Sequence, residues 1–307
     1  MSNRNKILYF IGIGGIGMSA LARWYKHQGA IIYGYDLVSS PLTDELINEG
    51  MNIHFDEDIS KLPKNIDTVV YTPAIPIDNI ELVYLKNKGV TIIKRAELIG
   101  KITKEFTTIA IAGTHGKTSI SALIAHLLVH ANINVSAFVG GICNNYNSNL
   151  ILSNSTDYLI IEADEYDRSL LQIEPNIAVI SSMDEDHLDI YQNHDDIKNT
   201  FKLFAQKLPQ DGLLIHNSKL APFDNAPGKH LTYGANTNAS IAASNIRVAN
   251  AKFVISTHHQ MFKTFMHTDA KYISAHVGFD QKENNPTYKI YLVFQHTSID
   301  IPPVGVP

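Results

Sequence analysis

Two glycine-rich turns, each standing between an apolar run and a helical pattern, constrain this fold more than any other feature of the sequence. The first, GIGGIG at residues 12–17, closes the apolar run KILYFIGI, and the second, GTHGKT at residues 113–118, closes FTTIAIAG. Further apolar and helical patterns alternate along the chain, as in AIIYGYD, PLTDELINEG and DTVVYTPAI. Alternation of this kind predicts parallel sheets with helices on both faces.

The length of 307 residues favours two domains. A new strand–helix cycle begins at residue 106, so we place the boundary near residues 102–106. Residues 1–104 then form a Rossmann-like parallel-sheet domain, and residues 105–307 form an α/β domain of the P-loop type. From about residue 229 the chain is rich in strand-forming residues without intervening helical patterns, which predicts an antiparallel β extension of the second domain.

Composition excludes several classes of protein. With 45% hydrophobic and 18% charged residues the chain reads as an ordinary soluble globular protein, and its net charge of −5 argues against non-specific nucleic-acid binding. No apolar run reaches the length of a membrane span, and glycines interrupt the apolar stretch near the N-terminus, which has no obvious cleavage site after it. Cys143 is the single cysteine, so no intramolecular disulfide is possible. We expect a cytoplasmic protein.

The first turn carries the pattern G-x-G-x-x-G through Gly12, Gly14 and Gly17, with Asp36 at the end of the next predicted strand. Small residues allow backbone N–H groups to approach a diphosphate at a helix N-terminus, and an aspartate in that place can accept hydrogen bonds from a ribose. The pattern predicts a nucleotide diphosphate but does not distinguish NAD from other such ligands. Alternatively, the glycines only permit tight packing of strand and helix.

The second turn, between a predicted strand and a predicted helix, has the composition of a phosphate-binding loop. Backbone N–H groups and Lys117 would hold the β- and γ-phosphates of a nucleotide, and the Thr118 hydroxyl would reach Mg²⁺. The turn departs from the usual G-x-x-x-x-G-K-[ST] because position 111 is Ile111 and the first glycine is Gly113.

Two acidic clusters follow at the ends of later predicted strands. The first contains Glu162, Asp164, Glu165 and Asp167, and the second contains Asp184, Asp186, His187 and Asp189. The carboxyl ends of parallel strands converge on the ligand crevice, where carboxylates and a histidine can hold Mg²⁺. A solvated acidic loop is the alternative for either cluster.

The motifs FIGIGGIGMSALA, GTHGKT, EADEYDRSLL and MDEDHLDIY, in this order, resemble those of the Mur ligases, and most closely the alanine-adding branch of that family. The resemblance implies that the first domain binds UDP-N-acetylmuramate and that the second binds ATP with Mg²⁺. The carboxylate of the sugar would take the γ-phosphoryl group of ATP, and the amine of L-alanine would then attack the resulting acyl phosphate.

The resemblance also assigns roles to individual positions. Residues expected to bind ATP are Gly113, Thr114, His115, Gly116, Lys117, Thr118 and Ser119. Residues expected to contact the UDP-sugar are Gly12, Gly14, Gly15, Gly17, Met18, Asp36, Thr72, His115, Asp167 and Arg168. Metal ligands are expected at Thr118, Glu162 and His187, and Lys117, Glu162 and His187 are expected to be catalytic. His115 either contacts the carboxylate of the sugar or only shapes the turn.

The chain departs from the family pattern after its β-rich part. Family members continue with a His-Asn-x-x-Asn segment and a third, Rossmann-like domain, and no such segment follows residue 230 here. We therefore expect a fragment that can bind the UDP-sugar and, weakly, ATP, but that does not turn over. Three alternatives stay open: a recycling ligase that adds a preformed tripeptide, an NAD-dependent oxidoreductase built on the first turn, and a non-catalytic nucleotide-binding fragment.

Overall fold

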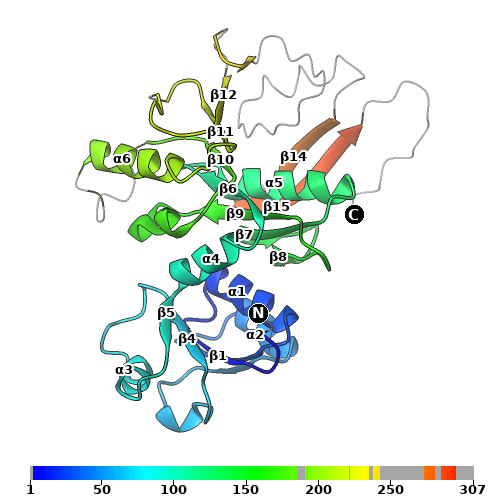
Figure 1. The fold of residues 1–307 in the computed structure, drawn as a ribbon. Helices are drawn as coiled ribbons and strands as arrows, with labels where there is room; N and C mark the ends of the chain where they lie inside the picture. Colours follow the sequence, from blue (N-terminus) through cyan, green and yellow to red (C-terminus); the bar gives the residue numbers. More distant parts are fainter. Residues whose placement is uncertain are drawn as a thin grey trace.

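The computed structural model describes residues 3–184, 191, 193–220, 222–234, 238–242, 273–280 and 285–294. Two α/β units lie one above the other, with the N-terminal unit at the bottom in Figure 1. Each unit is built on its own sheet, and helix α4 lies between the two. The predicted α/β architecture is therefore confirmed.

The first sheet has five parallel strands in the order β3-β2-β1-β4-β5. Its elements are β1 (Ile7–Ile11), α1 (Ile16–His27), β2 (Ile31–Tyr35), α2 (Pro41–Asn48), β3 (Asn52–His54), η1 (Ile59–Lys61), β4 (Thr68–Tyr71), α3 (Ile80–Asn87), β5 (Ile92–Lys94) and α4 (Arg95–Thr103). Alternate residues of β1 face opposite sides: Leu8 and Phe10 pack with α1, whereas Tyr9 and Ile11 pack with α3. Helices thus cover both faces, which leaves the ends of the strands for ligands.

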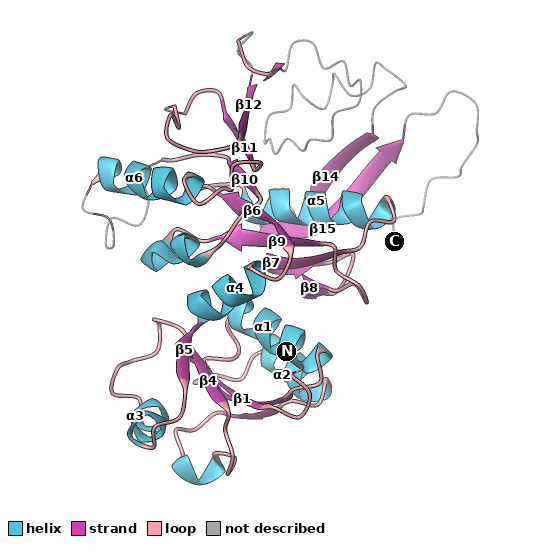
Figure 2. Cartoon of the chain, in the orientation of Figure 1, coloured by secondary structure: helices cyan, strands magenta, loops and turns pink. Residues whose placement is uncertain are grey.

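The second sheet has eight strands in the order β13-β12-β11-β10-β6-β9-β7-β8, all parallel except for the β7–β8 pair. Its elements are β6 (Thr107–Ala112), α5 (Lys117–His130), β7 (Val135–Cys143), β8 (Ser148–Ile151), β9 (Tyr158–Ala163), η2 (Tyr166–Gln172), β10 (Ile177–Ile180), α6 (His194–Ala205), β11 (Leu213–Asn217), β12 (Lys229–Gly234) and β13 (Ile241–Ala242). Helix α5 covers one face, and α6 with η2 covers the other (Figure 2).

The β-rich part of the chain differs from the expectation at its start. Strands β12 and β13 continue the second sheet in parallel: β12 pairs with every residue of β11, and β13 pairs with the end of β12. The antiparallel pair comes later, as β14 (Ile273–Asp280) with β15 (Asn285–Phe294) beside α5. Two short strands, β3 and β8, have no counterpart in the sequence prediction.

The two units meet across an apolar junction. Strand β5 runs into α4 without an intervening loop, and α4 packs against η2 of the second unit. The ring of Trp24 on α1 packs against Phe106 and Phe138, with ring centroids 5.7 and 5.4 Å apart. At Gly100 the backbone lies so close to the Gln172 carbonyl that an added Cβ atom would clash with it. One buried cluster therefore runs through both units.

A buried polar cluster, here termed the interdomain latch, also joins α1 to β8. Asn149 is fully buried and donates through Nδ2 to the Ile16 carbonyl at 2.6 Å and to Ser19 Oγ at 2.8 Å. Its Oδ1 atom accepts from Arg23 Nη1 at 2.6 Å. The Arg23 guanidinium also pairs with two glutamates of the first unit, Glu45 and Glu49. Buried polar groups satisfied in this way make the contact specific as well as stable.

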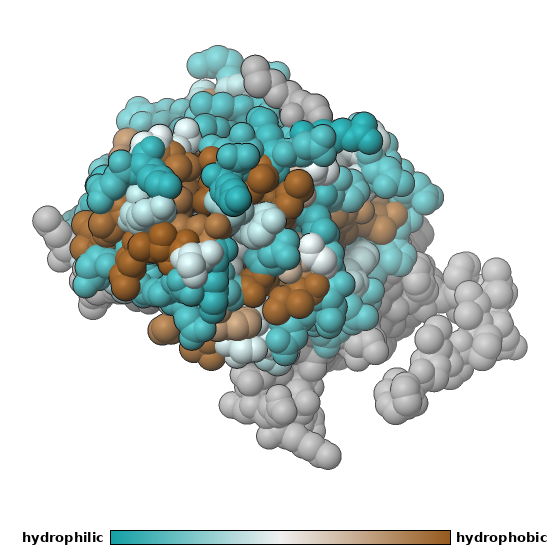
Figure 3. Space-filling model, turned by 90° about the horizontal axis from the view of Figure 1, so that it is seen from below, coloured by the Kyte–Doolittle hydropathy of each residue, from teal (hydrophilic) through white to brown (hydrophobic). Residues whose placement is uncertain are grey.

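The surface is mixed in character. The face seen from below carries apolar patches set among polar residues (Figure 3). Cys143, the single cysteine, is buried. None of the helices in the described part of the chain combines the length and the apolar character needed to cross a membrane.

Candidate nucleotide and substrate site

The second glycine turn adopts a backbone that only glycine tolerates well. Strand β6 ends at Ala112, and Gly113 follows with φ +136°, where an added Cβ atom would clash with Ser181 Oγ. Gly116 takes φ +84° as the N-cap of α5. The two glycines therefore permit the sharp passage from strand to helix that exposes the helix N-terminus.

Serines at the end of β10 hold the loop in place. Thr114 Oγ1 lies 2.9 Å from Ser182 Oγ, which also accepts from the His115 N–H at 2.9 Å. Ser181 Oγ donates to the His115 carbonyl at 2.5 Å. The His115 ring itself is exposed, with Nε2 3.7 Å from Asp184 Oδ2. Hydrogen bonding thus shapes the turn through the His115 backbone and leaves its ring at the surface.

Lys117 opens α5 and is held inside the loop. Its Nζ atom donates to the Gly113 carbonyl at 2.7 Å and to the two carboxylate oxygens of Glu165 at 2.9 and 2.8 Å. The Glu165 side chain is only 1% exposed. A buried carboxylate of this kind requires a paired cation, so Glu165 fixes the position of the lysine charge. Sequence reasoning grouped Glu165 with the acidic cluster but did not predict this pairing.

Glu162 and Thr118 form the second contact between the loop and β9. Thr118 Oγ1 donates to Glu162 Oε2 at 3.1 Å, and the Gly140 N–H donates to Oε1 at 2.6 Å. Burial raises the pKa of Glu162 to about 7, against the lowering effect of these two hydrogen bonds and of the Lys117 charge. A carboxylate and a hydroxyl are the hard oxygen ligands that Mg²⁺ prefers, so both residues fit such an ion.

The described residues contain no ready-made metal centre of three or more His, Cys, Asp or Glu side chains. His187, the third expected ligand, lies outside the described residues. A site with only a few protein ligands still suits Mg²⁺, because this ion commonly keeps several waters and binds phosphate oxygens of the substrate.

The first glycine turn is organised by Asp36. The Gly14 N–H donates to Asp36 Oδ2 at 2.7 Å, and the Val38 N–H donates to Oδ1 at 3.3 Å. A Cβ atom added to Gly14 would lie 2.9 Å from the same carboxylate, and Gly12 adopts φ +83°. Asp36 therefore supports the turn itself, a role that sequence reasoning did not assign to it.

Three further residues of the expected sugar site lie on or near this turn. Gly15 is the N-cap of α1, and Thr72, which follows β4, lies beside Gly12. Met18 is different: its side chain is buried in the core and its N–H donates to the Gly15 carbonyl. Its side chain therefore packs inside the protein directly beside the turn, where a Cβ atom added to Gly15 would lie 3.8 Å from Met18 Cγ.

Asp167 and Arg168 adopt two consecutive left-handed conformations, with φ +52° and +54°. Such backbone is costly for residues other than glycine and is retained where neighbouring contacts impose it. Lys94 Nζ lies 3.8 Å from Asp167, and Arg168 pairs with Asp196 of α6 at 2.8 Å. The Arg168 guanidinium also lies over the ring of Tyr191, with the centroid 5.6 Å from Cζ.

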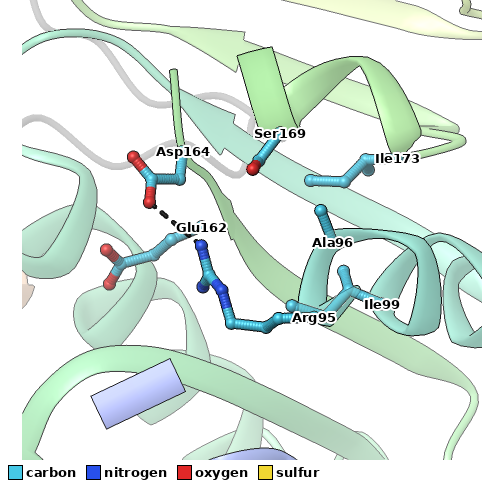
Figure 4. Close-up of a pocket in the computed structure, with 7 residues that line it drawn as sticks. All are labelled: Arg95, Ala96, Ile99, Glu162, Asp164, Ser169 and Ile173. Atoms are coloured by element: carbon cyan, nitrogen blue, oxygen red, sulfur yellow. Dashed lines mark hydrogen bonds and ion pairs between the residues drawn. The ribbon is translucent and has the colours of Figure 1, made fainter. Parts of the chain in front are cut away.

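A small pocket opens between α4 and the end of β9 (Figure 4). It is lined by Arg95, Ala96, Ile99, Glu162, Asp164, Ser169 and Ile173. In the pocket Arg95 Nη2 contacts Asp164 Oδ2 at 3.2 Å across the junction of the two units. Sequence reasoning missed Arg95 because it belongs to no glycine turn and no acidic cluster.

The sequence of the chain matches two protein-family models that together cover both units. Residues 111–279 match the family described as Mur ligase middle domain, and residues 7–107 match the Mur ligase family, catalytic domain. The chain belongs to the Mur ligase family. The Mur ligase motifs at residues 12–17, 113–118 and 162–171 accordingly fall on the two glycine turns and on the end of β9 with η2.

Curated Mur ligase relatives resemble this chain over most of its length. A UDP-N-acetylmuramate–L-alanine ligase of Porphyromonas gingivalis is 41% identical over 262 residues, or 83% of this chain and 58% of the relative. The ligase of the same name from Flavobacterium psychrophilum is 46% identical over 258 residues, or 82% of this chain and 56% of the relative. The chain thus spans somewhat more than half the length of the curated relatives it matches.

Solved Mur ligase structures share the fold. The UDP-N-acetylmuramate–alanine ligase of Thermotoga maritima matches with a TM-score of 0.65 and 28% identity, over 75% of this chain and 52% of that chain. A UDP-N-acetylmuramate:L-alanyl-γ-D-glutamyl-meso-diaminopimelate ligase from Neisseria meningitides matches with a TM-score of 0.70 over 76% of this chain and 79% of that chain. At 23% identity the second likeness concerns the fold alone.

Proposed function

We propose that this chain serves the ATP-dependent ligation of L-alanine to UDP-N-acetylmuramate in the synthesis of peptidoglycan precursors. In this proposal, residues 1–104 hold the UDP-sugar on the first glycine turn, and residues 105–307 hold ATP on the second. The observation that carries it is the convergence of Lys117, Thr118 and Glu162 at the carboxyl edge of the second sheet. The names of the curated relatives support the choice of substrates.

The reaction requires two anions to meet. A carboxylate oxygen of the sugar attacks the γ-phosphorus of ATP, an O–P bond forms, and the bond to the ADP oxygen breaks. The amine nitrogen of L-alanine then attacks the acyl carbon, the C–O bond to phosphate breaks, and the amine loses a proton. Concentrated positive charge is needed for the first step, because both reactants are negative.

The residues of the loop meet this need. The Lys117 ammonium, placed at the N-terminus of α5, would neutralise the phosphates, while backbone N–H groups of residues 113–119 would donate to their oxygens. Thr118 and Glu162 are the described residues that would hold Mg²⁺, which when bound supplies further charge neutralisation to the phosphoryl group. Gly12, Gly14, Gly15, Gly17, Asp36 and Thr72 would surround the UDP portion. His115, Asp167 and Arg168 would face the sugar side of the site.

A recycling ligase is the second candidate, since the sequence EADEYD at residues 162–167 resembles that branch of the family as well. The two readings differ in the amine that attacks the acyl phosphate. Identities of 41–46% to L-alanine ligases, against 23% to the recycling enzyme, favour alanine. An oxidoreductase would leave the second glycine turn and its lysine without a role.

Calorimetric titrations test this proposal on the 307-residue chain. We expect it to bind UDP-N-acetylmuramate and MgATP, and Lys117→Met to weaken only MgATP, by about 10-fold or more, since hydrogen bonds to charged groups contribute about 1.5–3 kcal/mol. Lys202→Met, an exposed lysine on α6, is the matched control and should change neither affinity. Tight NADH binding with no response to the UDP-sugar, or full MgATP affinity after Lys117→Met, would refute the proposal.

A further inference from the structure

Arg95 occupies a fixed position between the two glycine turns. It is the first residue of α4 and follows β5 directly, so no flexible loop separates it from the first sheet. Its side chain is 21% exposed and lines the pocket at the junction of the two units (Figure 4). A cation held by a strand on one side and a helix on the other has little conformational freedom to lose on binding a ligand.

The guanidinium faces both units at once. Nη2 donates to Asp164 Oδ2 at 3.2 Å, and Asp164 is itself oriented by the Tyr166 N–H, which donates to Oδ1 at 3.1 Å. On the other side, Nη1 lies 2.5 Å from the place that a Cβ atom on Gly17 would occupy. The third glycine of the first turn therefore has a specific consequence: it admits the Arg95 guanidinium to the first turn of α1.

The first turn of α1 has a local electrostatic character that suits an anion. Its N-cap is Gly15, no side chain caps the helix, and the first turn contains no acidic residue. The positive end of the helix dipole and the Arg95 charge thus lie at the same place. An arginine fork matches the oxygen geometry of a phosphate better than a lysine does, because its donors are planar and can bind in pairs.

We infer that Arg95 is a binding and positioning residue that contacts the diphosphate of the UDP-sugar on the first turn while Asp164 holds it toward the ATP site. This inference rests on the proposed function and adds to it a residue that bridges the two nucleotide sites. Asp164 and Glu162 lie on the same strand end, so the Arg95–Asp164 pair connects the sugar-nucleotide turn with the residues beside the phosphate loop.

Binding measurements with a series of uridine ligands test the inference. For Arg95→Ala we expect the affinities for UDP and for UDP-N-acetylmuramate to fall together by about 10–100-fold, since a charged hydrogen-bonding partner of the phosphate is lost. The affinities for uridine, which lacks phosphate, and for MgATP should stay within about twofold. Arg95→Lys should recover part of the loss because it keeps the charge without the fork.

Lys101→Ala is the matched control: it removes one positive charge from the same helix at an exposed position outside the pocket. It should leave all four affinities within about twofold of the original chain, as expected for an exposed site without contacts to the ligand.

The outcomes separate this inference from the proposed function. If the unaltered chain binds no UDP-N-acetylmuramate, the proposed function itself fails. If that chain binds it and Arg95→Ala binds UDP equally well, only the inference fails. A loss confined to UDP-N-acetylmuramate would place Arg95 on the sugar portion and overturn the diphosphate contact. An equal loss of MgATP affinity would mark a general disturbance of the junction and would overturn the inference as well.

Discussion

Asn149→Ala should weaken the association of the two units, so that they no longer unfold together. Asn149 is the β8 member of the interdomain latch, where it makes three side-chain hydrogen bonds to residues of α1. The substitution takes away the oxygen that accepts from Arg23 and the amide group that donates to the Ile16 carbonyl and to Ser19. Asn149 is fully buried, so water cannot replace these hydrogen bonds. It leaves the apolar part of the junction around Trp24 intact.

The size of the effect follows from the groups left without partners. A buried polar group that loses its hydrogen bond costs about 1–3 kcal/mol, and more if it is charged. Arg23 keeps Glu45 and Glu49, so its remaining loss is one buried N–H bond. Together with the Ile16 carbonyl, this predicts a loss of about 2–5 kcal/mol in the free energy of unfolding. At about 2–4 °C per kcal/mol for a large domain, Tm should fall by roughly 4–20 °C.

Urea unfolding measures the loss with a reporter at the right place. Trp24 is the single tryptophan, and its ring packs against Phe106 and Phe138 at the junction. In Asn149→Ala the fluorescence transition should come at lower urea than the loss of helical circular dichroism, because the units separate before each sheet unfolds. Asn154→Ala, the same change at an exposed position, is the control and should shift neither transition.

A change below about 0.5 kcal/mol in Asn149→Ala, with both transitions still coincident, would refute the reasoning, since that is the usual effect of a surface substitution. It would mean that the apolar contacts alone determine how the units associate. The hydrogen bonds of the latch would then contribute only to the geometry of the junction.

Two further predictions concern single positions. Gly113→Ala should lower MgATP affinity by about 10-fold or more, because its φ of +136° and the clash with Ser181 Oγ force the loop to move. Gly89→Ala is the control: Gly89 has φ +72° but open space around it, so the change should strain the fold without altering MgATP affinity. His126 is buried against His130, and burial first, then the neighbouring ring, lowers its pKa to about 4. In the unfolded chain His126 takes up a proton near pH 6.5, whereas in the folded chain it stays neutral down to about pH 4. The free energy of unfolding should therefore fall as the pH is lowered from about 6.5 to 4, and His126→Gln should lessen that fall in urea titrations at pH 7.5 and 5.

Local patterns were sufficient to predict most of the fold. Helix α2 begins at Pro41 and is followed by Gly50 at φ +85°, as its sequence indicates. Strand β8 was missed because an asparagine-rich segment precedes it and reads as a loop; it is stabilised by pairing with β7 and by the buried Asn149. Strand β12 was expected to be antiparallel because no helical pattern precedes it, but it pairs in parallel with β11.

The candidate site was predictable for residues that belong to a recognisable motif at the end of a predicted strand or the start of a predicted helix. Glu162 and Thr118 belong to motifs at the ends of elements, and the structure brings them within hydrogen-bonding distance. Arg95 and Ser182 have no motif of their own, and they become visible only when the fold brings distant segments together. The pairing of Lys117 with Glu165 was missed for the same reason, since 48 residues separate the two.

The contact between Gly100 and the Gln172 carbonyl limits how the two units can move. The backbones of α4 and η2 touch there with no room for a methyl group, so the two units cannot come closer along that line. We therefore expect any change in the angle between the two units to pivot near this contact, with the far ends of the two sheets moving the greatest distance. A larger residue at position 100 would act as a wedge and hold the pivot open.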